Sequence, residues 1–302
     1  LLVQDLTRPG RAITPVCADS LLTVLGRRGS QHDAQEFAAL LLSSLHDELQ
    51  QRNTKTAAGA GAGDASGTGD DDGWQEVGKA GRAHVVVQRA SDFAQSPITR
   101  IFGGVLRGIV RRAGGPASAS ATPFTWLPLE IDADEVTDIA SAIVHSLRGD
   151  DVDEGTARLR GEIVVLPEVL LLHLKRFAYE PRAGVRKITR EVAFPLELIV
   201  PGSVVVSGPL SQRTYTLASA VHHHGATADS GHYTADVLGL DGRWRMFDDD
   251  MVSTIADPTT RDRHASVYLL AYRRKQPGSE PARPRPAVTG AGGAGTAGAG
   301  NA

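Results

Sequence analysis

The chain has 302 residues, of which 41% are hydrophobic and 22% charged, enough for one large domain or two of average size. Its 32 Lys and Arg residues nearly balance 35 Asp and Glu residues, which gives a formal net charge of -3. The chain therefore lacks the strong positive field that favours binding to nucleic acid or to an anionic membrane. One cysteine, Cys17, excludes an intramolecular disulfide and a four-cysteine zinc site, and such sparse use is typical of a reducing compartment.

The first element that periodicity predicts is an amphipathic helix near the N-terminus. Its apolar residues recur every three or four positions, at Ala34, Phe37, Leu41, Leu45 and Leu49. Ser30 followed by Asp33 resembles a capping box at the start of this helix.

Two segments have compositions that do not fold alone. Residues 54–72 are rich in Gly, Ala, Ser and Thr and end in an acidic run, and we expect a mobile loop inserted in the domain. Residues 276–302 combine Pro and Arg with Gly/Ala repeats, which predicts a disordered tail. The chain does not begin with methionine, and we expect upstream sequence to be missing.

Between these segments the pattern changes from helix to strand. A second helical stripe comprises Val136, Ile139, Ile143 and Leu147. Short runs of β-branched, aromatic or leucine residues then predict strands at residues 163–166, 169–177, 215–221, 233–238, 243–247 and 267–272. Helices followed by strands, without regular β-α-β alternation, indicate an α+β fold.

The most informative residues for chemistry are a histidine and an acidic run in neighbouring predicted strands. A hairpin that turns at Asp241 and Gly242 would set His232 beside Asp248. A carboxylate that accepts from one imidazole nitrogen leaves the other nitrogen to take a proton from a nucleophile. For this pair alone, an ordinary strand histidine beside a solvated acidic turn is the simpler interpretation.

Three strings together resemble the ubiquitin-specific proteases, cysteine isopeptidases that remove ubiquitin. They are Gln-His-Asp-Ala-Gln-Glu-Phe at 31–37, Leu-Leu-His-Leu-Lys-Arg-Phe at 171–177, and the block from Gly-His-Tyr at 231–233 to Phe-Asp-Asp at 247–249. They occur in the order of that family, and the resemblance spans about residues 13–274. The strings at 71–78 and 91–104 are similar to the ubiquitin carboxyl-terminal hydrolase 10 subgroup.

The resemblance implies a fold, partners and a location. The fold would be papain-like α+β, arranged as thumb, palm and fingers, within residues 1–275. Ubiquitin and ubiquitinated proteins would be the partners, with no cofactor, nucleic acid or membrane. The family is expected in the cytoplasm, and the nucleus is a further expectation.

The resemblance also implies roles for particular residues. His232 would be the general base, Asp248 would orient it, and Asp249 would support the oxyanion or a water, with the choice between the two aspartates left open. Asp33 and Glu36 match an acidic pair that meets the arginine-rich C-terminal tail of ubiquitin; helix capping is the alternative, and the two roles can coexist. The remaining residues expected to contact ubiquitin are His223, His224, Tyr233 and Phe177.

The chain departs from the family at its nucleophile and at its fingers. The asparagine-x-cysteine-tyrosine box of the family is absent, and Cys17 lacks the surroundings that lower a thiol pKa from about 8.5, so we expect a buried structural cysteine there and the nucleophile before Leu1. By this interpretation the fragment is inactive alone. Residues 102–129 lack Cys-x-x-Cys pairs, so the fingers are expected to hold no zinc.

Two other functions stay open. If the upstream part carries no cysteine, the protein would be an inactive ubiquitin-binding scaffold, although such a scaffold has no need of His232 and Asp248. A generic α+β interaction domain is the third hypothesis. No metal is expected at residues 222–224, because adjacent histidines in a strand point to opposite faces.

Overall fold

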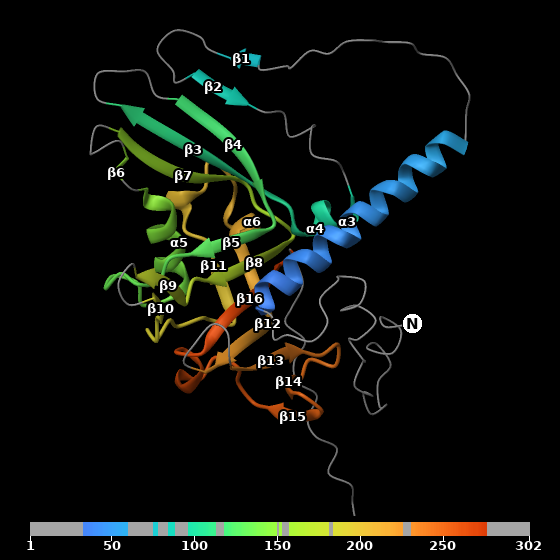
Figure 1. Ribbon diagram of the computed structural model, residues 1–302, viewed down its shortest axis with the longest axis vertical. Coiled ribbons are helices and arrows are strands. Elements are labelled where there is room, and N and C mark those ends of the chain that lie inside the picture. The colour runs from blue at the N-terminus through green and yellow to red at the C-terminus, as the bar shows by residue number, and fades with distance from the viewer. Residues whose placement is uncertain are drawn as a thin grey trace, which may run out of the picture.

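The computed structural model describes residues 33–59, 75–77, 84–87, 96–112, 118–149, 151–152, 157–180, 184–225 and 231–276. Within these residues two large sheets, a two-stranded sheet and a few helices form a mixed fold, which confirms the α+β prediction (Figure 1). The helices are α3 (Ala34–Gly59), α4 (Pro97–Phe102), α5 (Ile139–Arg148) and α6 (Leu210–Arg213). Among the described helices, none is both long and apolar enough to cross a membrane.

The larger sheet carries the chemistry-bearing strings and has the strand order β15-β14-β13-β12-β16-β8-β5. Its strands are β5 (Trp126–Leu129), β8 (Val169–Leu174), β12 (Thr214–His224), β13 (His232–Leu238), β14 (Trp244–Asp248), β15 (Met251–Ile255) and β16 (Val267–Arg274), with β11 (Glu197–Ile199) paired to β12. Neighbouring strands are antiparallel except β5 and β8, which run parallel. Most of the predicted strands are confirmed, whereas the run predicted at 169–177 divides into β8 and a separate strand.

The smaller sheet occupies the opposite end of the molecule, at the top of Figure 1. Its strands are β1 (Gln75–Val77), β2 (His84–Val87), β3 (Gly104–Arg112), β4 (Ser118–Phe124), β6 (Asp151–Val152) and β7 (Ala157–Val165). The long antiparallel ladders of β3 with β4 and β7 hold this region, which corresponds to the expected fingers. Arg107 and Glu162 add an ion pair across β3 and β7. A separate hairpin is formed by β9 (Phe177–Glu180) and β10 (Gly184–Lys187).

The long helix α3 differs from its prediction at both ends. It begins at Ala34, and Asp33 is its N-cap, because the Asp33 Oδ1 atom accepts from the backbone N–H groups of Gln35 at 2.8 Å and Glu36 at 3.0 Å. Ser30, the expected cap, lies outside the described residues. At the other end the helix runs to Gly59, so residues 54–59 of the expected loop are helical; Lys and Ala are good helix formers there. Residues 60–72 and the tail from 277 lie outside the described residues.

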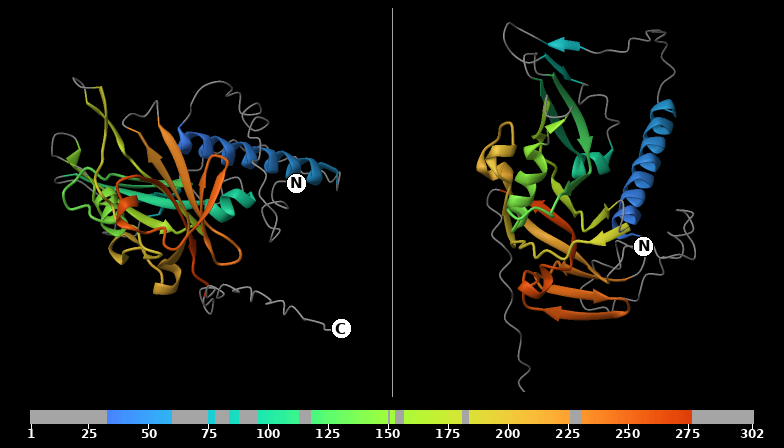
Figure 2. Two further views of the ribbon diagram at one scale, coloured as in Figure 1. Left: turned by 90° about the horizontal axis from the view of Figure 1, so that it is seen from below. Right: turned by 60° about the vertical axis from the view of Figure 1, so that its left-hand side comes forward.

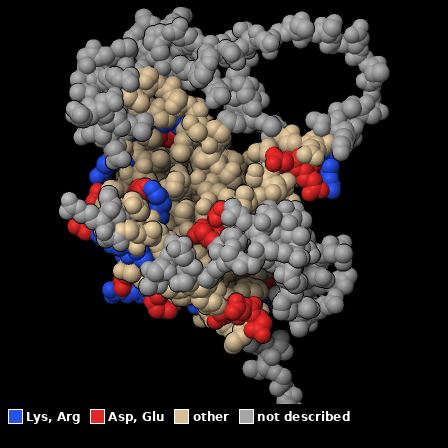
Figure 3. Space-filling view, in the orientation of Figure 1, with Lys and Arg blue, Asp and Glu red and all other residues tan. Residues whose placement is uncertain are grey.

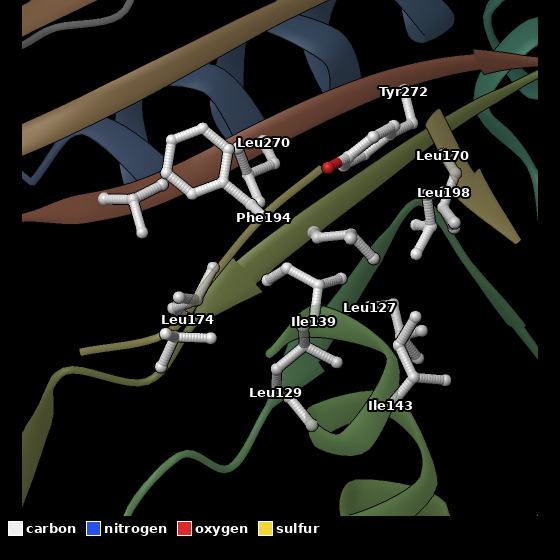
Figure 4. Close-up of a cluster of buried hydrophobic side chains, with 14 of the residues drawn as sticks. Leu127, Leu129, Ile139, Ile143, Leu170, Leu174, Phe194, Leu198, Leu270 and Tyr272 are labelled. Atoms are coloured by element: carbon white, nitrogen blue, oxygen red, sulfur yellow. The ribbon is translucent and has the colours of Figure 1, made fainter. Parts of the chain in front are cut away.

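The core lies between α5 and the larger sheet. Asp138 caps α5 by accepting from the Ser141 backbone at 2.7 Å, and the predicted stripe Val136, Ile139, Ile143 and Leu147 is buried. Figure 4 shows Ile139 and Ile143 facing leucines and Tyr272 of the sheet. Each such side chain contributes about 1.5–3 kcal/mol on burial. This packing fixes the strands that carry the site.

A buried arginine joins three loops at one end of the sheet. Arg176 is fully buried, and its guanidinium donates to the carbonyls of Val267 at 2.5 Å, Ile188 at 3.0 Å, Arg190 at 3.0 Å and His264 at 2.7 Å. Burial lowers the pKa of Arg176 to about 10, so the group stays charged at neutral pH. Arg176 lies in the short connection between the end of β8 at Leu174 and the start of β9 at Phe177, so its contacts hold this connection against the segments around it.

Candidate active site

The hairpin of β13 and β14 brings the predicted histidine and aspartate together. Leu238 pairs with Trp244 and Ala235 with Phe247, so the first residue of β13 and the last of β14 lie near the same end of the hairpin. The turn relies on Gly242, whose φ of 74° is a conformation that favours glycine. This geometry follows from the local sequence, as the turn signal predicted.

His232 and Asp248 form a hydrogen bond between Nε2 and Oδ1. Their side chains are 44% and 38% exposed, so both remain accessible to a substrate. The hydrogen bond with Asp248, assisted by the charges of Asp248 and Asp249, raises the pKa of His232 against the opposing effect of desolvation. Because Nε2 donates to the carboxylate, Nδ1 is the nitrogen that can accept a proton.

Asp249 begins the tight turn that connects β14 to β15. Its φ of 49° lies in the left-handed region, which aspartate tolerates better than most residues. Single donor atoms of His232, Asp248 and Asp249 all lie within 4.8 Å of one another, so this set is also the one in the described chain that could hold a metal ion. A cation there would compete with the His232–Asp248 hydrogen bond. The role of Asp249 as oxyanion or water support stays a prediction.

The two faces of β12 and β13 carry different side chains. His224 pairs with His232 and His223 with Tyr233, and directly opposite residues of a strand pair share a face. We call the side with Tyr233 and His223 the tyrosine face and the side with His232 and His224 the histidine face. Both His223 and His224 were expected to contact ubiquitin, and the structure places these adjacent histidines on opposite faces, as the alternation of side chains along a strand predicts.

On the tyrosine face, Asp33 connects α3 to the sheet. Its Oδ2 atom accepts from the hydroxyl of Tyr268 at 2.6 Å and, more weakly, of Tyr233 at 3.4 Å, while Oδ1 caps the helix. Burial first, and then the Asp33 carboxylate, raise the pKa of both tyrosines, so both hydroxyls stay protonated donors. Glu36 lies in the first turn of the same helix. Asp33 therefore caps the helix and still presents its charge to the sheet.

His223 is buried in an aromatic cluster on the tyrosine face. Its ring lies 5.3 Å from that of Phe177 and 4.9 Å from that of Tyr233. Lys187 contacts the His223 Nδ1 atom at 3.1 Å, and burial together with this cation lowers the pKa of His223. The imidazole is therefore neutral, with Nδ1 accepting and the hydrogen on Nε2. Within the described chain, Nε2 has no hydrogen-bond partner, and a Cβ atom on Gly231 would lie 2.3 Å from it.

The histidine face carries a buried charge network behind His232. Asp236 is fully buried and accepts from Arg263 Nη1 at 2.5 Å and from His222 Nε2 at 3.0 Å. His222 in turn lies 3.2 Å from the Ser266 hydroxyl through Nδ1. His224 contacts the Thr234 hydroxyl at 2.9 Å. No sequence signal marked Asp236 or Arg263, since a lone aspartate in a strand and an arginine in a turn are common on surfaces.

Sequence reasoning also missed two residues of the tyrosine face. Tyr268 looks like an ordinary residue of a buried strand, and its need for a hydroxyl partner was the one available signal. Lys187 donates to the carbonyls of His223 at 3.1 Å and Gly225 at 2.6 Å, so it closes the end of β12. His173 packs edge-on against Tyr268 with ring centroids 4.9 Å apart, in keeping with the structural role expected for it.

Replacing Asp248 with asparagine should lower the pKa of His232 toward its ordinary value. The hydrogen bond to the carboxylate is the largest cause of the upward shift, and an amide oxygen carries no charge. NMR titration of the His232 ring measures this pKa directly in the chain. Asp250→Asn is the matched control, because it removes a charge from the same turn without contacting His232. Equal shifts in both variants would show that the pairing does not set the pKa.

The fold and the His232–Asp248 pair together indicate the class of protein to which the chain belongs. An α+β scaffold with a histidine and an aspartate paired on adjacent strands is typical of papain-like hydrolases, in which such a pair activates a thiol. The family model described as ubiquitin carboxyl-terminal hydrolase matches residues 4–272. The chain belongs to this family, which confirms the resemblance of its three motifs.

Curated relatives and solved structures agree with this family. The chain is 34% identical over 311 residues to ubiquitin carboxyl-terminal hydrolase 10 of Gallus gallus, covering 90% of the chain and 39% of the relative. It is 34% identical over 293 residues to probable ubiquitin carboxyl-terminal hydrolase 3 of Schizosaccharomyces pombe, covering 82% and 56%. The chain thus spans well under two thirds of these relatives.

A structure of the Ubp8-Sgf11-Sgf73-Sus1 SAGA DUB module is similar with a TM-score of 0.54 at 25% identity, covering 63% of this chain and 44% of that one. A related SAGA DUB module bound to monoubiquitin has a TM-score of 0.53 at 25% identity, covering 61% and 44%. The papain-like fold of the ubiquitin-specific protease type is therefore confirmed.

Proposed function

We propose that the protein is a deubiquitinase that hydrolyses the isopeptide or peptide bond at the C-terminal glycine of ubiquitin through a thiol. The observation that carries this proposal is the His232–Asp248 hydrogen bond, in a chain of the ubiquitin carboxyl-terminal hydrolase family. A general base held by a carboxylate is needed for acyl transfer, whereas a binding scaffold has no use for it. The thiol would come from a cysteine before Leu1 in the full-length protein.

Each proton transfer of the proposed reaction can be written for a named atom. His232 Nδ1 takes the proton of the thiol, and the Asp248 carboxylate stabilises the imidazolium that forms. The thiolate attacks the carbonyl of the terminal glycine, and His232 then returns the proton to the leaving amine. In the second half of the reaction His232 takes a proton from water, which attacks the acyl-enzyme. Asp249 would help to orient that water by accepting a hydrogen bond from it, because its carboxylate lies beside His232 and Asp248.

The tyrosine face is the proposed path of the ubiquitin tail. Asp33 and Glu36 supply negative charge at the start of α3, and Tyr233, Phe177 and His223 form an aromatic wall beside them. Arginine side chains bind carboxylates strongly and also stack on aromatic rings. An arginine-rich tail would therefore bind along this face. His224 lies on the other face and is not part of this wall.

Labelling with a ubiquitin that carries a C-terminal electrophile tests the proposal. The full-length protein should form a covalent adduct, and Cys17→Ser should form it equally well, because the sequence around Cys17, which lies outside the described residues, lacks the family's asparagine-x-cysteine-tyrosine box. Ubiquitin binding without an adduct would instead support the inactive scaffold. Absence of both binding and adduct would leave the generic interaction domain.

Asp33→Asn should weaken ubiquitin binding while the fold is kept. Asparagine caps helices as well as aspartate does, and its amide can still bond to the tyrosine hydroxyls, but the charge that attracts the tail is lost. We expect an affinity about tenfold lower, which corresponds to about 1.4 kcal/mol, by calorimetry. Asp47→Asn, an exposed charge further along α3, is the control. Equal affinity of wild type and Asp33→Asn would leave Asp33 as a cap alone.

We also propose that the protein acts in the cytoplasm, with the nucleus as a further location. The support is the sparse use of cysteine, which suits a reducing compartment. Cell fractionation with antibodies to the native protein tests this.

A further inference from the structure

A pocket of about 350 Å³ opens on the histidine face beside the catalytic pair. His232 and Asp248 form part of its lining, together with Met246, Asp262 and Arg263. The tyrosine-face residues that are proposed to hold the ubiquitin tail do not line it. The pocket and the tyrosine face therefore lie on opposite faces of the sheet, and His232 lies at the boundary between these two proposed binding regions.

The substrate extends to both sides of the cleaved bond, with the ubiquitin tail on one side and the leaving lysine segment on the other. The group that protonates the leaving nitrogen must lie next to that nitrogen. General acid catalysis requires that the leaving atom lie within hydrogen-bond distance of the imidazole. His232 shares the histidine face with the pocket, whereas Asp33 and Tyr233 lie on the tyrosine face. The leaving side of the substrate is thus directed toward the pocket.

We propose that this pocket binds the lysine-bearing segment of the ubiquitinated substrate and favours basic residues next to that lysine. The proposal rests on the proposed deubiquitinase function and names the substrate chemistry on the leaving side of the same site.

The lining offers an apolar surface for the stem of the lysine, whose nitrogen is an uncharged amide in the isopeptide bond, and a carboxylate for charged residues beside that lysine. Met246 offers a soft apolar surface for the methylene stem of the lysine. Asp262 supplies an exposed carboxylate, and a hydrogen bond with Thr260 lowers the pKa of Asp262, which keeps it ionised at neutral pH. Cationic residues flanking the lysine would therefore be attracted to this side of the pocket.

The one cation of the lining is already neutralised. Arg263 donates to the fully buried Asp236 at 2.5 Å, so its charge does not oppose a basic segment. Acidic side chains also gather over β14 and β15 in the face shown in Figure 3. The charge around the pocket is therefore complementary to a basic peptide and unfavourable for an acidic one.

Three substrates that share ubiquitin but differ in the leaving group test whether the pocket recognises the leaving side. The first is ubiquitin joined through an isopeptide bond to a lysine flanked by arginines, the second has aspartates in place of the arginines, and the third is ubiquitin aminocoumarin, which has no peptide. The full-length protein should cleave the basic conjugate with a kcat/KM about threefold to fivefold above that of the acidic one. Asp262→Lys should reverse this order and leave ubiquitin aminocoumarin hydrolysis unchanged.

A control variant shows whether the effect of Asp262→Lys depends on its position in the pocket. Glu168→Lys makes the same charge change outside the pocket and should preserve the wild-type order. If Asp262→Lys keeps the preference, or changes all three substrates equally, the pocket does not bind the leaving side. If the wild-type protein cleaves none of the three, the deubiquitinase proposal itself fails. The preference for flanking charge thus tests the pocket separately from the activity.

Discussion

Replacing His232 with alanine should reduce isopeptide hydrolysis by the full-length protein on the order of 10⁴-fold. His232 is asked both to remove the thiol proton and to protonate the leaving amine, and no other described residue combines an imidazole with the Asp248 partner. The loss should appear in kcat, because the tyrosine face, which is proposed to hold the ubiquitin tail, is left intact. Single-turnover kinetics with a ubiquitin conjugate measure it.

The variant should still bind ubiquitin and remain folded. The His232 side chain is 44% exposed, so its removal creates no buried cavity. His145→Ala is a matched control, since that histidine also contacts a carboxylate, at 3.1 Å in Glu135, but lies on α5. Asp248→Asn should fall between wild type and His232→Ala, because the amide oxygen still orients the ring. Near-normal hydrolysis by His232→Ala would overturn the assignment of the base.

Replacing Arg176 with methionine should lower the free energy of unfolding by about 4 kcal/mol. The carbonyls of Val267, Ile188, Arg190 and His264 would lose the Arg176 donor in a buried setting, although that of His264 keeps the Val192 N–H at 3.2 Å; each carbonyl left without a donor costs about 1–3 kcal/mol, partly relieved by rearrangement. Urea unfolding followed by circular dichroism measures the change.

The neighbouring Lys175→Met is the control for this variant. Lys175 pairs with Glu130 at a position that is 45% exposed, where an ion pair contributes about 0–1 kcal/mol. Arg176→Lys should lie between the two, because an ammonium cannot reach all of the carbonyls at once. A loss below about 1 kcal/mol for Arg176→Met would show that the loops are held by other contacts.

Local patterns predicted the parts of the molecule that depend on neighbouring residues. The stripe of α5 was visible because its apolar positions follow the helical period, and the His232–Asp248 pair was visible because a glycine turn fixes the hairpin. The end of α3 was wrong because a Gly/Ala-rich composition was taken as loop, although its alanines and lysine favour helix. The expected cap, Ser30, lies outside the described residues, whereas Asp33, predicted as the second residue of the capping box, is the N-cap of the helix that begins at Ala34.

Contacts between residues that are far apart in the chain leave no comparable pattern in the sequence. The Asp33–Tyr268 hydrogen bond joins residues 235 apart in the chain, and the acceptors of Arg176 are backbone carbonyls, which every residue has. The parallel pairing of β5 with β8 likewise depends on a crossover that composition does not reveal. The catalytic pair could therefore be found from sequence, whereas the surroundings that shape its two sides could not.

Figure 2 shows the ribbon of the sheet that contains β12 in two further views, and the alternation of side chains along this strand also restricts how the region can change in length during evolution. His222 and His224 belong to one face and His223 to the other, so deletion of a single residue within the strand would exchange them. Deleting or inserting two residues keeps each side chain on its face. Homologous proteins should therefore vary here in steps of two, or take up an odd change in a β-bulge, as β12 already does between Leu217 and Ser219 where its register with β16 shifts.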